Sequence, residues 1–125
     1  LKQKSIRVEP VREAGKLVIP SSHGFNVLII DDIIRLEADG CYTTITNKEG
    51  KKTIVSRTLK DFENTLSKDK FFRTHKSHMV NLKYIKDYSN LSGSFVTMTD
   101  GSKVEISRRK APDFIQKVKS FLKSV

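Results

Sequence analysis

Five cations and two histidines are concentrated in residues 70–86, a stretch that contains no acidic side chain. Within it, residues 71–85 alternate apolar side chains with cationic, imidazole and hydroxyl side chains. A basic segment held to a core by Phe, Val, Leu and Ile is a fixed surface rather than a loose tail. This pattern is typical of a polyanion-binding face, because clustered Lys and Arg attract phosphates.

A second basic cluster, residues 107–110, reads Ser-Arg-Arg-Lys between an expected strand and an expected helix. The helix dipole disfavours cations at an N-terminus, so three consecutive cations there indicate a functional role. The planar fork of Arg can bond guanine O6 and N7 together. The whole chain carries 24 Lys and Arg against 14 Asp and Glu, a net charge of +10, which favours nucleic acid or an anionic membrane surface as partner.

Other chemistry has weaker support in the sequence. His75 and His78 would share a face of a helix and could then hold a metal, but their neighbours favour strands and no Asp, Glu or Cys is close in sequence. The single cysteine, Cys41, is typical of a small core residue and fits a reducing, cytosolic compartment. Glycine-rich phosphate loops are absent. We therefore expect no catalytic residue, no metal and no cofactor.

The elements that position these residues are mainly strands joined by short turns, so the sheets should be antiparallel. We expect a linker or an added edge strand over residues 1–15 and one domain over residues 16–125. Apolar and β-branched runs predict strands at 17–19 (stopped by Pro20), 25–30, 33–37, 41–46, 53–55, 84–88, 95–99 and 103–106. Thr58 and Asp61 predict a capped short helix. A C-terminal amphipathic helix starts at Pro112, or alternatively after Ser107.

No run of about 18 apolar residues is present to cross a membrane, and no signal peptide is visible. The chain opens on Leu rather than Met. We therefore expect a fragment of a longer protein.

Three segments, in order, resemble the LytTR-type DNA-binding domain. They are LEADGCYT (36–43), FFRTHKSHMVNLKYI (71–85) and DGSKVEISRR (100–109). The middle segment is similar to the family signature F-x-R-[IVTC]-H-[KRN]-S-x-[IVL]-V-N-x-x-x-I, and the match covers about residues 16–123. The resemblance implies a mainly β fold, an elongated set of small antiparallel sheets with one short inserted helix and the C-terminal helix.

The resemblance also implies roles for individual residues. Loops, rather than a recognition helix, would enter successive grooves of double-stranded DNA. By motif position, Lys76 and Arg108 would read bases, and Tyr42 or Thr43 would supply a third contact. Phosphate contacts would come from Arg73, Ser77, Arg109 and Lys110. Asn81 belongs to the signature, but we expect it to serve the fold.

The implied protein is the output half of a bacterial two-component response regulator, with an N-terminal receiver domain missing from this chain. It would act in the cytoplasm, not as an enzyme, with two copies bending DNA at repeated sites. Two alternatives stay open from the residues. One is a single-stranded nucleic-acid binder on an OB-like barrel, which would expose stacking aromatic rings. The other is a metal-dependent nuclease using His75 and His78.

Overall fold

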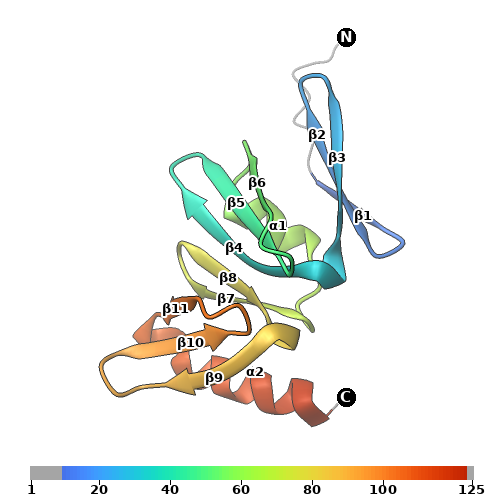
Figure 1. The fold of residues 1–125 in the computed structure, drawn as a ribbon. Helices are drawn as coiled ribbons and strands as arrows, with labels where there is room; N and C mark the ends of the chain where they lie inside the picture. The colour runs from blue at the N-terminus through green and yellow to red at the C-terminus, as the bar shows by residue number, and fades with distance from the viewer. Residues whose placement is uncertain (1–9, 124–125) are drawn as a thin grey trace.

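The computed structural model describes residues 10–123, which form three antiparallel sheets and two helices (Figure 1). The first six strands are β1 Val11–Glu13, β2 Lys16–Ser21, β3 Gly24–Ile29, β4 Ile33–Asp39, β5 Tyr42–Asn47 and β6 Lys52–Val55. After helix α1 Leu59–Thr65 follow β7 Phe71–His75, β8 His78–Asn81, β9 Ile85–Ser89, β10 Ser94–Met98, β11 Lys103–Ile106 and helix α2 Ala111–Lys123. Short 3-10 turns are η1 Ile30–Asp32, η2 Leu82–Tyr84 and η3 Arg108–Lys110.

The three sheets lie one after another along the molecule, so the domain is elongated (Figure 1). Their strand orders are β1-β2-β3, then β6-β5-β4-β8-β7, then β11-β10-β9. Every strand pairing within these sheets is antiparallel. This confirms the predicted fold class of small antiparallel sheets with one inserted and one C-terminal helix.

The first core lies between the β1–β3 sheet, the central sheet and α1. Leu17 and Ile19 of β2 point into it with Ile45 of β5, and all three are at most 2% exposed. The predicted capping box of α1 is confirmed, since Thr58 and Asp61 each accept the other's backbone N–H. The predicted apolar face of α1 is buried here: Leu59, Phe62 and Leu66.

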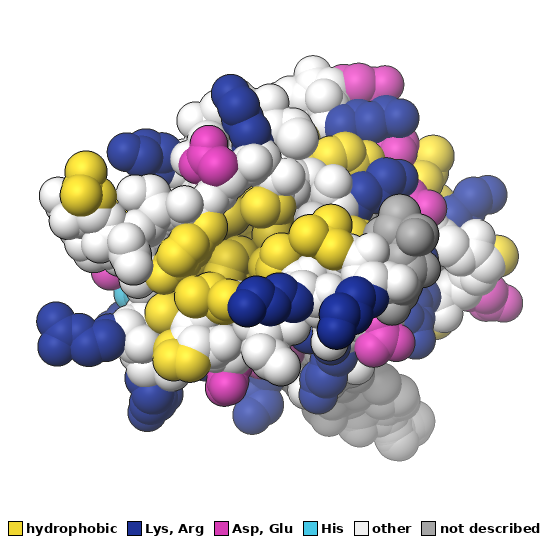
Figure 2. Space-filling view, turned by 90° about the horizontal axis from the view of Figure 1, so that it is seen from below, with side chains coloured by type: hydrophobic (Ala, Val, Ile, Leu, Met, Phe, Trp, Pro, Cys, Tyr) yellow, Lys and Arg dark blue, Asp and Glu magenta, His cyan; other side chains and the backbone are white. Residues whose placement is uncertain are grey.

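The second core lies between the central sheet, the β9–β11 sheet and α2. Its centre is Phe114 of α2, which packs edge-on against Phe72 with ring centroids 5.4 Å apart. Val96 and Val104 of the β10–β11 hairpin are buried beside it. Seen from below, the molecule has a hollow lined by apolar side chains, with Lys and Arg around it (Figure 2).

Strands β7 and β8 lie between the two cores and supply side chains to both. Phe71 and Met79 belong to the first core, whereas Phe72 and Val80 pack in the second. Neighbouring residues of a strand point to opposite faces, so the hairpin is buried on both sides. The sequence predicted an anchored surface here but did not predict two strands, because the apolar residues come as adjacent pairs, Phe71-Phe72 and Met79-Val80, rather than at every second position.

Two other local expectations differ from the structure. Pro20 lies inside β2 rather than ending it. It pairs with Phe25 of β3, and β1 pairs only with residues 16–18, so the absent N–H of Pro20 faces no strand. At the other end, α2 begins at Ala111, one residue before Pro112, and residues 108–110 form a separate 3-10 turn.

Residues 1–15 were expected to form either a linker or an added edge strand, and part of this segment forms an edge strand. β1, Val11–Glu13, pairs with β2, so ordered structure begins before residue 16. Residues 1–9 of that segment lie outside the described residues.

Asn81 joins β8 to two other backbone segments. Its side-chain Nδ2 donates to the Ile33 carbonyl over 2.8 Å, and its Oδ1 accepts the Lys83 N–H over 3.0 Å. The residue is 2% exposed, so water cannot replace these bonds. The structure thus supports the predicted fold role of Asn81.

We predict that Asn81→Ala lowers the free energy of unfolding by about 2–4 kcal/mol, because a buried carbonyl and N–H lose their partners. Urea unfolding at pH 7 measures the change. Asn90→Ala, at an exposed turn, is the matched control and should stay within about 0.5 kcal/mol of the parent protein. Equal effects of the two substitutions would contradict the bridging role.

His78 gives the fold a pH dependence. Burial lowers the pKa of His78 below its ordinary value of 6.5, and the nearby Glu37 carboxylate partly opposes this. Folding therefore favours the neutral ring. This contribution to stability is complete above pH 6.5, the pKa of His78 in the unfolded chain. It is lost as the pH falls from 6.5 toward the lower pKa of His78 in the folded protein.

We predict that the parent protein loses more unfolding free energy than His78→Gln when the pH falls from 7.5 to 5. Urea unfolding at a series of pH values measures both slopes. His23→Gln, in an exposed turn, should keep the parent slope. Parallel curves for the parent protein and His78→Gln would show that this ring does not carry the dependence.

Candidate nucleic-acid interface

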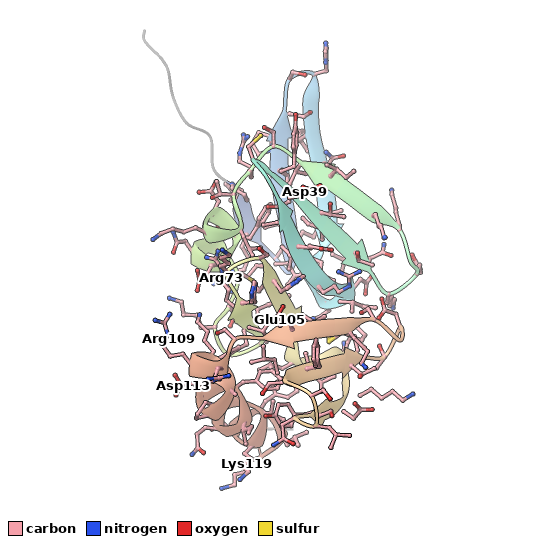
Figure 3. All side chains as sticks on the ribbon, turned by 90° about the vertical axis from the view of Figure 1, so that its left-hand side faces the viewer. Asp39, Arg73, Glu105, Arg109, Asp113 and Lys119 are labelled. Carbon is pink, nitrogen blue, oxygen red and sulfur yellow. The ribbon has the colours of Figure 1, made fainter. Side chains whose placement is uncertain are left out.

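Three segments far apart in sequence meet along one edge of the molecule, and we name this the loop edge: residues 39–43, 75–77 and 107–110. The β4–β5 turn and the β7–β8 turn are joined by a backbone bond from the Ala38 N–H to the Ser77 carbonyl, 2.9 Å. The Ser107 N–H donates to the Thr74 carbonyl over 2.8 Å. Figure 3 views this edge, with Asp39, Arg73, Glu105 and Arg109 along it.

The β7–β8 turn is the middle of the loop edge. Lys76 is exposed at its tip, while His75 and Ser77 are half-buried. The His75 Nδ1 accepts the Ser77 N–H over 3.1 Å, and its Nε2 lies 3.9 Å from the Glu105 carboxylate. The turn is thus closed by its own side chain, and Lys76 projects from a fixed backbone.

Arg73 lies behind this tip and is committed to internal contacts. Its Nη1 pairs with the Glu63 carboxylate of α1 at 2.9 Å, and its Nη2 donates to the Lys76 carbonyl at 2.6 Å. Its side chain is only 21% exposed. The expected phosphate contact by Arg73 therefore has little geometric support, and the guanidinium instead holds the loop to α1.

Lys110 makes a similar internal contact. Its Nζ donates to the Arg73 carbonyl over 3.2 Å and is half-buried. Arg108 and Arg109 are exposed, and neither guanidinium has a hydrogen bond or ion pair to another residue within 10–123. Residues 73, 75, 76, 107, 109 and 110, with Glu63, line one cleft of about 390 Å³. The middle and last segments thus share one surface.

The β4–β5 turn separates the two alternatives for the third contact. Tyr42 is 50% exposed, whereas Thr43 is fully buried. The Thr43 hydroxyl donates to the Arg57 carbonyl over 2.7 Å. The structure therefore argues against Thr43 as a base contact and leaves Tyr42, because adjacent strand residues point to opposite faces.

Acidic side chains also lie on the loop edge, although no role was expected for them from the sequence. Asp39 and Glu105 are exposed there (Figure 3). Carboxylates repel phosphates but accept hydrogen bonds from cytosine N4. No local sequence signal could have placed Glu105 opposite His75, because the two residues meet only through the packing of β11 beside β7.

His75 and His78 lie side by side, with ring centroids 5.5 Å apart. Burial lowers the pKa of His78, which favours the neutral ring, the form in which histidine binds metals. No group of three or more His, Cys, Asp or Glu side chains suited to a metal occurs among the described residues. Within the same residues, no helix is long and apolar enough to cross a membrane.

Comparisons with known proteins agree with this geometry. The family model described as the LytTr DNA-binding domain matches residues 23–119. A solved LytTr DNA-binding domain from Bacillus cereus superposes with a TM-score of 0.72 and 25% identity, covering 85% of this chain and 98% of that chain. The fold is thus that of a LytTr DNA-binding domain.

Curated relatives are longer proteins. The chain is 31% identical to the sensory transduction protein LytT of Bacillus subtilis over 86% of its own length and 46% of LytT. It is 33% identical to the heme-containing CO-sensing transcriptional regulator RcoM 2 of Paraburkholderia xenovorans, over 70% of this chain and 34% of that protein. The chain therefore spans a third to a half of these relatives, and it belongs to the LytTr family of DNA-binding domains.

Proposed function

We propose that this chain is the DNA-reading part of a bacterial transcription regulator, and that its loop edge reads double-stranded DNA. The observation that supports this best is the convergence of three turns on one edge, each with an exposed side chain that can reach a base. Lys76, Arg108 and Tyr42 are these side chains. Lys and Arg donate to guanine acceptors in the major groove, and the tyrosine hydroxyl can donate or accept.

The remaining residues of the edge position the protein. Arg109 and Ser77 are available for phosphate contacts, which fix orientation without reading sequence. Arg73 and Lys110 act mainly through the loop, since Arg73 donates to the Lys76 carbonyl at its tip and Lys110 donates to the Arg73 carbonyl behind the tip. Their loss would loosen the tip that carries Lys76.

At the level of the whole protein, we propose that a receiver or another sensing domain of the same polypeptide controls this DNA-reading domain. The relatives favour this, because LytT and RcoM 2 are named for sensory transduction and CO sensing and are two to three times longer than the matched region. Two copies would bind repeated sites and bend the DNA between them. The protein would act on DNA in the cytoplasm by binding rather than by catalysis.

The direct test is selection from random DNA duplexes with the purified domain. We expect an enriched motif at moderate salt, and preference for that duplex over its separate strands. Neutralising about 6–10 phosphates should lower affinity by about 10³–10⁵ between 50 and 200 mM salt. Recovery of no motif would overturn the proposal. Tighter binding to the separate strands would favour the single-stranded alternative.

Adjacent arginines allow a matched test of base reading. We predict that Arg108→Ala costs about 1–3 kcal/mol on the selected duplex and relaxes specificity at one base pair, because a bidentate contact is lost. Arg109→Ala, the same change one residue on, should weaken selected and random duplexes alike. Titrations of both variants against both duplexes measure this. An equal loss for Arg108→Ala on both duplexes would remove its assignment as a base reader.

A further inference from the structure

The β1–β3 sheet has an apolar outer face that the described part of the chain leaves open. Pairing register places Val11, Val18 and Val27 in one row across the three strands, with Pro20 beside Phe25. Ile29 lies beyond Val27 on the same face, because side chains two residues apart share a face. We name these six residues the outer face.

The exposure of this face is unusual for its composition. Phe25 is 65% exposed, Ile29 52%, Val11 51% and Val27 47%. The opposite face of the same sheet is the packed one, where Leu17 and Ile19 are at most 1% exposed. An antiparallel sheet with one buried face normally presents polar side chains to water. Here both faces are apolar, as in a sheet covered on both sides.

The edge of the sheet is equally unprotected. β3 is an outer strand, and residues 24–30 contain no charged residue in a chain whose charged content is 30%. Soluble proteins usually protect an open edge with Lys, Pro or a bulge. Pro20 lies on the neighbouring strand, and β3 itself carries none of these devices. The composition of β3 is therefore that of a strand covered by another surface.

Charge decides which partner this face fits. Two charged residues of the described chain, Glu13 and Lys16, lie on the same side of the sheet as the outer face and pair across β1 and β2. Their charges cancel, so this side of the sheet is neutral in a chain of net charge +10. A neutral face gives no attraction for nucleic acid or for an acidic protein. One acid and one base side by side are self-complementary in charge, because a second copy presents the same pair of opposite charges.

The size of the face suits a modest interface. Four side chains about half exposed and two partly exposed give an apolar patch on the order of several hundred Å², the range in which patches on monomers usually have a function. Two such faces with their rims bury about 1,200 Å², the lower limit of specific interfaces. The expected association is therefore in the micromolar range rather than nanomolar.

We propose that two copies of this chain associate through the outer face of the β1–β3 sheet, packed face to face about a two-fold axis. The β1–β3 sheet projects from the opposite side of the molecule to the three turns of the loop edge (Figure 1). Association therefore leaves both loop edges open. It supplies a contact for the two-copy binding proposed above. The association does not require DNA, so it can be tested separately from DNA reading.

Sedimentation equilibrium of the purified chain without DNA tests the interface. We expect a monomer–dimer equilibrium with a dissociation constant in the micromolar range. Dimerisation should strengthen at least threefold from 50 to 500 mM salt, because salt screens the repulsion between two +10 copies. DNA affinity changes in the opposite direction with salt, so the two associations are distinguishable.

The variant is Phe25→Thr with Val27→Thr, which keeps residues suited to strands and removes apolar area only from the outer face. We expect at least tenfold weaker dimerisation, with unchanged thermal unfolding and unchanged affinity for a single DNA site. Leu122→Ser on α2 is the matched control, because Leu122 is also 65% exposed, and it should dimerise like the parent.

A monomer at 500 µM in both salts would overturn the interface. So would a dimer that Leu122→Ser weakens and the β3 variant does not. A failed duplex selection with an intact dimer would instead count against DNA reading alone.

Discussion

The burial of the β7–β8 hairpin on both faces is the constraint on which the rest of the domain depends. Phe71 and Met79 fill one core, and Phe72 and Val80 fill the other. Burying such side chains stabilises each core by about 1.5–3 kcal/mol per residue. The two cores thus share one hairpin, and its turn cannot move without disturbing both. This fixes the place from which Lys76 projects.

A loop that reads DNA must also keep its shape before DNA arrives, since ordering it on binding would cost affinity. Three contacts supply this order: the Glu63–Arg73 ion pair, the Arg73 bond to the Lys76 carbonyl and the Lys110 bond to the Arg73 carbonyl. They link α1, β7 and η3 in one chain of interactions. Arg73 and Lys110, which look available for phosphate in the sequence, thereby hold the turn that carries Lys76.

The sequence predicted the parts of the fold that depend on local rules. The Thr58–Asp61 capping box and the short turn between the strands predicted at 95–99 and 103–106 are set by neighbours in the chain, and both occur in the structure. Strands β7 and β8 were not predicted, because each buries a pair of adjacent apolar residues, one in each core, instead of an apolar residue at every second position. Thr43 and Tyr42 were equivalent in the motif, and only the register of β5 with its neighbours shows which one is buried. The partnership of Arg73 with Glu63 joins residues ten apart on different elements, which no spacing rule gives.

The acids of the loop edge change how its net charge should be interpreted. A purely cationic edge would bind any duplex, since phosphate attraction is independent of sequence. Asp39 and Glu105 weaken that attraction beside the cations that we propose to reach bases. A carboxylate near a base edge is desolvated at a cost unless a donor such as cytosine N4 meets it. If the edge reads bases as proposed, these acids would penalise wrong sequences more than right ones, while the net charge of +10 over the whole chain would maintain general attraction to DNA. The proposed specificity would then follow from mixed charge on a rigid edge rather than from the number of its cations.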